Sequence, residues 1–155
     1  MDAEKCRPMK VIVAVDGSAG AKDAVKSVAA RPWPNGSVFR VISVFDAVLP
    51  SNAAGGGIPR ELRQRYREGA AAPARAAIAR AATTLRNAGL TIDDRTIEGN
   101  PARAIVDHAG RWGADLVVLG SRGLTRARRF LLGSVASYVA ANAPCSVEIV
   151  RKTKP

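Results

Sequence analysis

The sequence predicts an α/β fold with a single open five-stranded parallel sheet and helices on both faces. Five short segments rich in β-branched residues alternate strictly with helix-forming segments, a pattern typical of parallel strands joined by right-handed crossover helices. Residues 10–16 (KVIVAVD) and 115–120 (DLVVLG) are almost continuously apolar, as expected for strands covered on both faces. The chain has 155 residues, 47% of them hydrophobic, which suits one core and a single domain over residues 1–155.

The first βαβ unit is expected at the start of the chain. Residues 10–16 form its first strand, and Ser18 caps a helix that runs to about Val28. That helix must end before Pro32, because prolines restrict the backbone there. Residues 37–46 (SVFRVISVFD) then form the second strand.

The middle of the chain combines a glycine-rich segment with an arginine-rich one. Residues 47–59 contain three consecutive glycines and two prolines, so we expect a mobile surface loop within the domain. Residues 59–89 are rich in helix formers. Gly69 and Pro73 are expected to interrupt or kink this helix.

The last third of the sequence supplies the remaining elements. A third strand is expected at 90–99, a helix at 101–113 and a fourth strand at 115–120. A helix at 134–143 and a fifth strand at 144–152 follow. The connection from the fourth strand to the helix at 134–143, residues 120–136 (GSRGLTRARRFLLGSVA), holds three glycines and four arginines.

This permissive and positively charged connection suggests a phosphate-binding loop. The Walker pattern G-x-x-x-x-G-K-[ST] and the Rossmann pattern G-x-G-x-x-G both fail at every strand-to-helix turn. The spacing that is present is Gly120, two residues, Gly123, nine residues, then Gly133-Ser134 at a helix start.

With this spacing, the chain resembles the universal stress protein family in its ATP-binding branch. The resemblance runs through VIVAVDGS, EGNPARAIVDHA, ADLVVLGSRG and LLGSVASYVAANAPCSVEIV, and covers the domain except its middle. It implies strand order 3-2-1-4-5, with ATP across the carboxyl ends of strands one and four, which is the topological switch point of such a sheet. It also implies a homodimer that pairs through the C-terminal strand.

The resemblance further implies roles for individual residues. Asp16 is expected near the ribose or near a phosphate-bound Mg²⁺, which makes it the candidate metal ligand. Val44 is expected to offer backbone hydrogen bonds to adenine. The residues expected around the phosphates are Gly120, Arg122, Gly123, Gly133, Ser134 and Val135.

The chemistry of these residue types agrees with a phosphate site. Glycines expose main-chain N–H groups to phosphate oxygens, and Ser134 adds a hydroxyl and the amides of a helix start. Gly123 is expected to adopt a positive φ, so that a β-branched side chain there would disfavour the loop and block the phosphate.

Some of the residues in this region have a plainer interpretation. Arg122, between the glycines, is expected to contact the ligand, and Arg128 and Arg129 are expected to belong to a solvated basic surface. Arg126 is assigned to neither role. Asp16 could instead cap only the helix that follows it. His108 has no partner on its helix face for a triad or a metal site, so it is expected to be structural.

Composition bounds the function classes. The net charge of +11 and the pI near 10.8 favour anionic partners. Only Cys6 and Cys145 occur, and the N-terminal sequence matches neither a signal peptide nor a membrane span, so we expect a cytoplasmic protein without a membrane partner. The leading hypothesis is an ATP-binding regulatory or interaction module with an unknown protein partner.

Two alternatives remain. A slow Mg²⁺-dependent ATP hydrolase is the first, although no residue is placed by sequence as a convincing water activator, so turnover stays undecided. The second is a basic nucleic-acid-binding protein, which is disfavoured because the chain lacks a recognition motif and an aromatic stacking platform.

Overall fold

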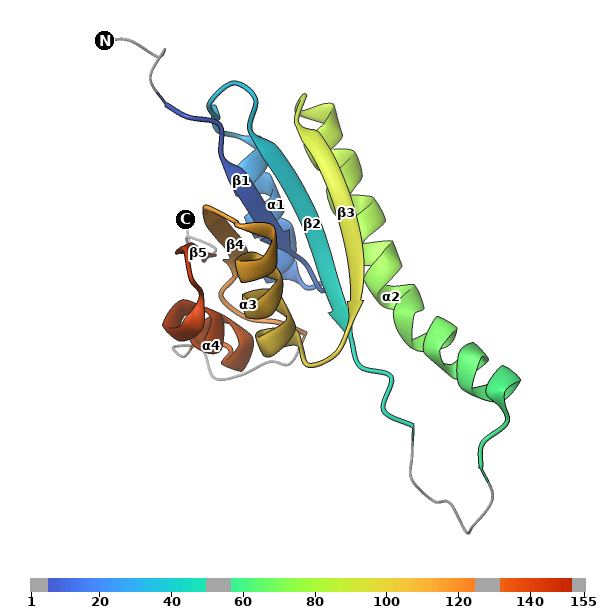
Figure 1. The fold of residues 1–155 in the computed structure, drawn as a ribbon. Helices are drawn as coiled ribbons and strands as arrows, with labels where there is room; N and C mark the ends of the chain where they lie inside the picture. Colours follow the sequence, from blue (N-terminus) through green and yellow to red (C-terminus); the bar gives the residue numbers. More distant parts are fainter. Residues whose placement is uncertain (1–5, 50–56, 125–131, 152–155) are drawn as a thin grey trace.

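The computed structural model describes residues 6–49, 57–124 and 132–151 (Figure 1). Strands and helices alternate along the chain as the sequence predicts. The strands are β1 (Lys10–Ala14), β2 (Val38–Phe45), β3 (Thr91–Glu98), β4 (Leu116–Gly120) and β5 (Ser146–Val150). The helices are α1 (Ala19–Ala29), α2 (Arg60–Asn87), α3 (Pro101–Trp112) and α4 (Ser134–Asn142).

The five strands form one parallel sheet in the order β3-β2-β1-β4-β5, which confirms the predicted topology. β1 lies at the centre, with β2 on one side and β4 on the other. Along the chain, β2 and β3 are added on one side of β1, and β4 and β5 are then added on its other side. The carboxyl ends of β1 and β4 are therefore the switch point, where ligands of open α/β sheets bind.

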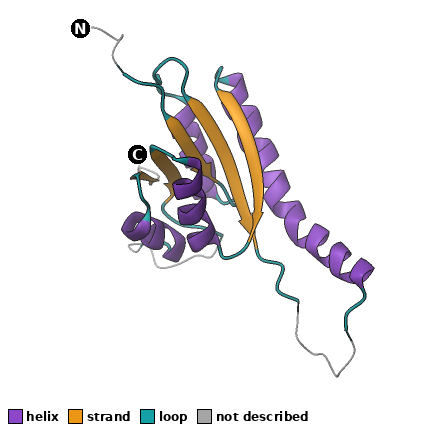
Figure 2. Cartoon of the chain, viewed as in Figure 1, coloured by secondary structure: helices purple, strands orange, loops and turns teal. Residues whose placement is uncertain are grey.

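Helices cover both faces of the sheet (Figure 2), and each face carries its own apolar core. Val11 and Val13 of β1 pack with residues of α1 and α2. Ile12 between them points to the other face, where it packs with residues of α3 and α4. This alternation within β1 explains why its sequence is apolar without interruption.

Local signals fix the helix ends near the switch point. The Ser18 hydroxyl accepts a 3.1 Å hydrogen bond from the N–H of Ala21, which confirms the predicted cap of α1. The side chain of Asn100 caps α3 in the same way, by accepting from the N–H of Arg103 at 3.1 Å. Both helices thus begin directly after strands that end at the same edge of the sheet.

The expected interruption at Pro73 does not occur, because α2 continues through it from Arg60 to Asn87. Proline lacks an N–H, and its ring crowds the carbonyl of the residue four positions earlier, which is Gly69. Both residues are exposed, so water can solvate that carbonyl. Residues 60–69 are all exposed and project beyond the sheet (Figure 1).

Two predictions fall outside the described residues, in whole or in part. Residues 50–56 of the expected loop at 47–59 are among them, and so are Arg126, Arg128 and Arg129. Within the described ranges, no helix is long and apolar enough to cross a membrane.

Candidate functional site

A cavity of about 390 Å³ opens at the carboxyl ends of β1 and β4. We call it the β1–β4 cavity. It brings together all eight residues that the sequence identified, although they come from four separate parts of the chain. Those residues are Asp16, Val44, Gly120, Arg122, Gly123, Gly133, Ser134 and Val135.

One wall of the β1–β4 cavity is apolar. Ile42 and Val44 of β2 contribute to it, with Leu119 of β4 and Ile105 of α3. Of these wall residues, only Val44 was predicted from the sequence. The signal was available, because Ile42 and Val44 alternate with residues of the opposite face, and Pro101 begins the helix that covers them.

The backbone of Val44 is open toward the cavity. Ile42 is the last β2 residue paired with β1, and its carbonyl accepts from the N–H of Val15 at 2.9 Å. Because peptide groups alternate sides along a strand, the N–H and C=O of Val44 also point to the β1 side, beyond the end of β1. They are therefore placed to bond a flat polar edge that enters the cavity.

Asp16 braces the turn that leads from β1 into α1. Its Oδ1 accepts a 2.9 Å hydrogen bond from the N–H of Ser18, while the helix cap itself is Ser18. Its Oδ2 faces the loop after β4, where a Cβ on Gly123 would lie 2.9 Å away. The carboxylate thus does more than begin the helix, since one oxygen is directed to the glycine loop.

Gly120 and Gly20 permit a close contact between β4 and α1. A Cβ on Gly120 would lie 2.5 Å from the carbonyl carbon of Gly20, and a Cβ on Gly20 would lie 2.7 Å from the carbonyl oxygen of Arg122. Both distances are shorter than side chains tolerate against backbone. Gly20 was not predicted from the sequence, because its importance depends on a contact between distant segments.

The loop after β4 returns on itself before α4. The N–H of Gly133 donates to the carbonyl of Ser121 at 2.8 Å, and a Cβ on Gly133 would lie 3.3 Å from the same oxygen. The expectation of a positive φ at Gly123 is wrong, because Gly123 is not among the residues with positive φ. Close packing, rather than left-handed backbone, requires these glycines.

The N-terminus of α4 points into the cavity through Ser134 and Val135. Gly133 occupies the cap position and provides no side-chain acceptor. Within the described part of the chain, no hydrogen bond satisfies the N–H groups of Ser134 and Val135. First-turn amides of a helix attract anions, because they carry the positive end of the helix dipole.

Arg122 brings positive charge to the cavity rim. It is exposed, and its carbonyl oxygen lies 3.5 Å from the Ser18 hydroxyl. No salt bridge holds its guanidinium among the residues that the structure describes. Its side chain is therefore available to an anion.

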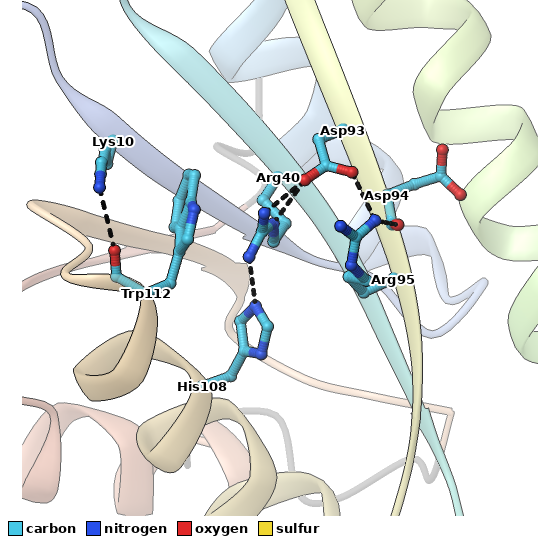
Figure 3. Close-up of polar contacts among 7 residues, drawn as sticks. All are labelled: Lys10, Arg40, Asp93, Asp94, Arg95, His108 and Trp112. Atoms are coloured by element: carbon cyan, nitrogen blue, oxygen red, sulfur yellow. Dashed lines mark hydrogen bonds and ion pairs between the residues drawn. The ribbon is translucent and has the colours of Figure 1, made fainter.

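His108 lies elsewhere on the same sheet face, in a cluster around Arg40 (Figure 3). Its Nε2 is 3.3 Å from a guanidinium nitrogen of Arg40, which also pairs with Asp93 and stacks 4.4 Å from the centre of the Trp112 ring. Burial lowers the pKa of His108, and the nearby charge of Arg40 lowers it further. His108 is not among the residues that line the β1–β4 cavity.

The chain has clear relatives in sequence. Residues 8–151 match the family model described as the universal stress protein family. A universal stress protein from Thermus aquaticus is 32% identical over 141 residues, which cover 91% of this chain and 97% of the relative. Another from Methanocaldococcus jannaschii is 47% identical over 66 residues, which cover 43% of this chain and only 39% of the relative.

A solved structure extends the comparison to three dimensions. The crystal structure of a universal stress protein in complex with cAMP aligns with a TM-score of 0.67 and 26% sequence identity. The alignment covers 94% of this chain and 98% of that chain. The shared architecture therefore spans nearly the whole domain.

Proposed function

The chain belongs to the universal stress protein family, and from this premise we propose that it binds ATP in the β1–β4 cavity as a nucleotide-dependent regulatory or interaction module. The observation that carries the proposal is the meeting of three features at one cavity. They are the glycine loop after β4, the N-terminus of α4, and the apolar wall beside the open backbone of Val44. The related protein crystallised with cAMP supports an adenine nucleotide as the ligand class.

The two ends of the cavity suit the two ends of ATP. Adenine would lie against Ile42 and Val44, where an apolar wall and free backbone groups recognise a flat heterocycle. The phosphates would lie over Gly123 and the α4 N-terminus, with Arg122 adding a guanidinium. The carboxylate of Asp16 lies beside Gly123, and we propose that it would contact the ribose or a metal on the phosphates.

Mg²⁺ fits the cavity only together with the nucleotide. Asp16 supplies a hard carboxylate oxygen, and Mg²⁺ is commonly held by one or two carboxylates together with substrate phosphates. The described residues contain no cluster of three or more His, Cys, Asp or Glu side chains that could hold a metal alone. We therefore propose that Mg²⁺ enters as the ATP complex and offsets repulsion between Asp16 and the phosphates.

Binding without efficient turnover is the better supported activity. Among the described lining residues, Asp16 is the acidic side chain, and neither His nor Glu lines the cavity to activate a water. Slow Mg²⁺-dependent hydrolysis remains the second candidate, because phosphates bound beside a metal are positioned for attack.

We also propose that the protein is a cytoplasmic homodimer. β5 is an edge strand of the sheet, and a second copy that paired with it would protect its backbone groups from solvent. Both cysteines are free, which suits the reducing cytoplasm.

The deciding experiment identifies the ligand directly. Freshly purified protein is denatured, and the released small molecules are identified by mass spectrometry. A second portion of the protein, kept folded and freed of any bound ligand, is titrated calorimetrically with ATP, ADP, AMP and cAMP, with and without Mg²⁺. GTP is the control for base recognition. An empty protein that also ignores every adenine nucleotide would refute the proposal.

A further inference from the structure

A second and larger concavity, of about 570 Å³, lies between α1 and α2 on the opposite face of the sheet from α3 and α4. We call it the α1–α2 groove. It exists because small side chains face one another across the two helices. Its main lining residues are Ala21, Lys22, Val25 and Lys26 of α1 with Ala77, Arg80, Ala81 and Thr84 of α2.

The floor of the α1–α2 groove is apolar. Ala21, Val25 and Ala77 are each 4% exposed, and Ala81 is 5% exposed. Thr84 is an exposed lining residue, and its hydroxyl already donates to the carbonyl of Arg80 at 3.2 Å. The floor therefore suits a hydrocarbon or aromatic body.

The rim of the groove is positive. Lys22 and Lys26 are four residues apart on α1, so their like charges repel on one helix face. A guanidinium nitrogen of Arg80 lies 3.4 Å from the position of a Cβ on Gly17, so Arg80 reaches from α2 to the turn that begins α1. Within the described ranges, no salt bridge neutralises any of these three cations.

The dimensions favour a small molecule over a partner helix. Ala77 to Thr84 spans two helical turns, or about 10 Å, which is too short to hold a long amphipathic helix. The volume lies within the range of ordinary ligand pockets, roughly 300–1,000 Å³. An acidic head group would relieve the repulsion between Lys22 and Lys26, while an apolar body of about 10 Å would cover the alanines.

We propose that the α1–α2 groove is a binding site for an amphipathic organic anion, such as a medium-chain carboxylate. Its acid group pairs with Lys22 and Arg80 at the end near Gly17, and its apolar body lies along Val25 and Ala81. The proposal does not rest on nucleotide binding: the two cavities adjoin at Val15 and Ala21, but Lys22, Val25, Arg80 and Ala81 line the groove alone.

Octanoate is the probe, and octanamide is its neutral control. Each is titrated into the ¹⁵N-labelled full chain, and binding is followed by backbone amide shifts. Val15 and Ala21 line both cavities, so they are not used as reporters. Saturable shifts at Val25, Ala81 and Thr84 with octanoate, and affinity about tenfold weaker or worse with octanamide, are expected.

Charge reversal at the rim supplies the matched comparison. The double variant Lys22→Glu/Arg80→Glu should weaken octanoate binding at least about tenfold. Arg65→Glu/Arg75→Glu makes the same change of net charge at exposed positions of α2 outside the groove, and should leave the affinity within about twofold.

Three results would overturn the proposal. They are the absence of saturable shifts with octanoate, shifts confined to residues outside the groove, and equal weakening by the two double variants. If the protein bound no nucleotide but octanoate still shifted the backbone amide signals of Val25, Ala81 and Thr84, the groove proposal would hold and the nucleotide proposal would not.

Discussion

The carboxylate of Asp16 lies against Gly123, so close that a Cβ atom on Gly123 would be 2.9 Å from Oδ2 of Asp16. The two residues follow β1 and β4, and β1 pairs with β4 from Val11↔Leu116 onward. A side chain at position 123 would therefore displace the carboxylate, the loop or both. Gly123 is required here by a neighbour, because its own φ is not positive.

The first prediction is that Gly123→Val abolishes the rise in melting temperature produced by ATP and Mg²⁺. The branched side chain would push away Asp16 and fill the phosphate end of the cavity, so the affinity should fall at least about tenfold. A ligand that binds only the folded state stabilises it by mass action, so thermal denaturation with and without ATP measures the loss.

A matched series separates the clash with Asp16 from other effects at position 123. Gly123→Ala introduces the Cβ alone, and Asp16→Ala removes its neighbour. If the clash causes the loss, the double variant Asp16→Ala/Gly123→Ala should bind ATP no more weakly than Asp16→Ala. Normal affinity in Gly123→Val would count against the proposed phosphate site.

The second prediction is that Gly120→Ala lowers the free energy of unfolding even without ligand. Its Cβ would meet the backbone of Gly20 at 2.5 Å, and backbone cannot rotate away as a side chain can. Forcing the two segments apart should cost about 2 kcal/mol or more, measured by urea denaturation. Gly69→Ala is the control: a Cβ there has no neighbour within 4 Å, and alanine favours a helix interior, so this variant should not be destabilised. Equal stability of Gly120→Ala and the wild type would refute the close-packing role.

The third prediction is that Pro73→Ala stabilises the domain. Alanine would restore the hydrogen bond to the carbonyl of Gly69 and remove the ring from a helix interior. A proline there costs about 3 kcal/mol, offset in part by the stiffer unfolded chain, so a gain of about 2 kcal/mol is expected in urea denaturation. Ala72→Gly, at the exposed neighbouring position, should instead lose about 1 kcal/mol; an unchanged midpoint for Pro73→Ala would contradict the argument.

The fold was predictable because its signals are local. Continuous apolar runs predicted β1 and β4, and the Ser18 cap predicted the start of α1. The interruption expected at Pro73 was wrong, because an exposed helix can leave the carbonyl of Gly69 to water.

The candidate site was predictable only through the glycine spacing and the family resemblance. Gly20 and Ile42 were missed, since their importance arises from contacts between segments far apart in sequence. The positive φ expected at Gly123 was wrong. This glycine is required by its close neighbour Asp16, which is 107 residues away in sequence and could not be recognised from the local pattern.

The fourth prediction concerns pH. Because the pKa of His108 is lowered in the folded protein, mainly by burial and then by the charge of Arg40, the unfolded chain binds a proton first as the pH falls. Stability from His108 is therefore fully present above its ordinary pKa of 6.5 and decreases as the pH falls toward the lowered value.

The chain has a single histidine, so the change between about pH 6.5 and pH 5 can be assigned to it. The folded pKa values of Asp93 and Asp115 are also lowered, but their contribution is lost only at more acidic pH. Urea denaturation across this range should show falling stability for the wild type and a flatter profile for His108→Gln. The same slope in both proteins would exclude His108 as the cause.

The last prediction is that the protein is a homodimer through β5. The carbonyl of Val150 accepts from the N–H of Ser121 at 3.0 Å, so the peptide groups of Val150 face β4. Since peptide groups alternate sides along a strand, those of Val147 face the free edge and those of Glu148 face β4. Val147→Pro should therefore remove a donor needed only by a partner copy, leave the β4 ladder intact and shift the protein to monomer.

Glu148→Pro, by contrast, should break the ladder with β4 and lower the stability of the monomer itself. Light scattering at micromolar concentration, with circular dichroism to verify folding, distinguishes the cases: a monomeric wild type would refute the dimer, and a folded Val147→Pro variant that stayed dimeric would place the interface elsewhere.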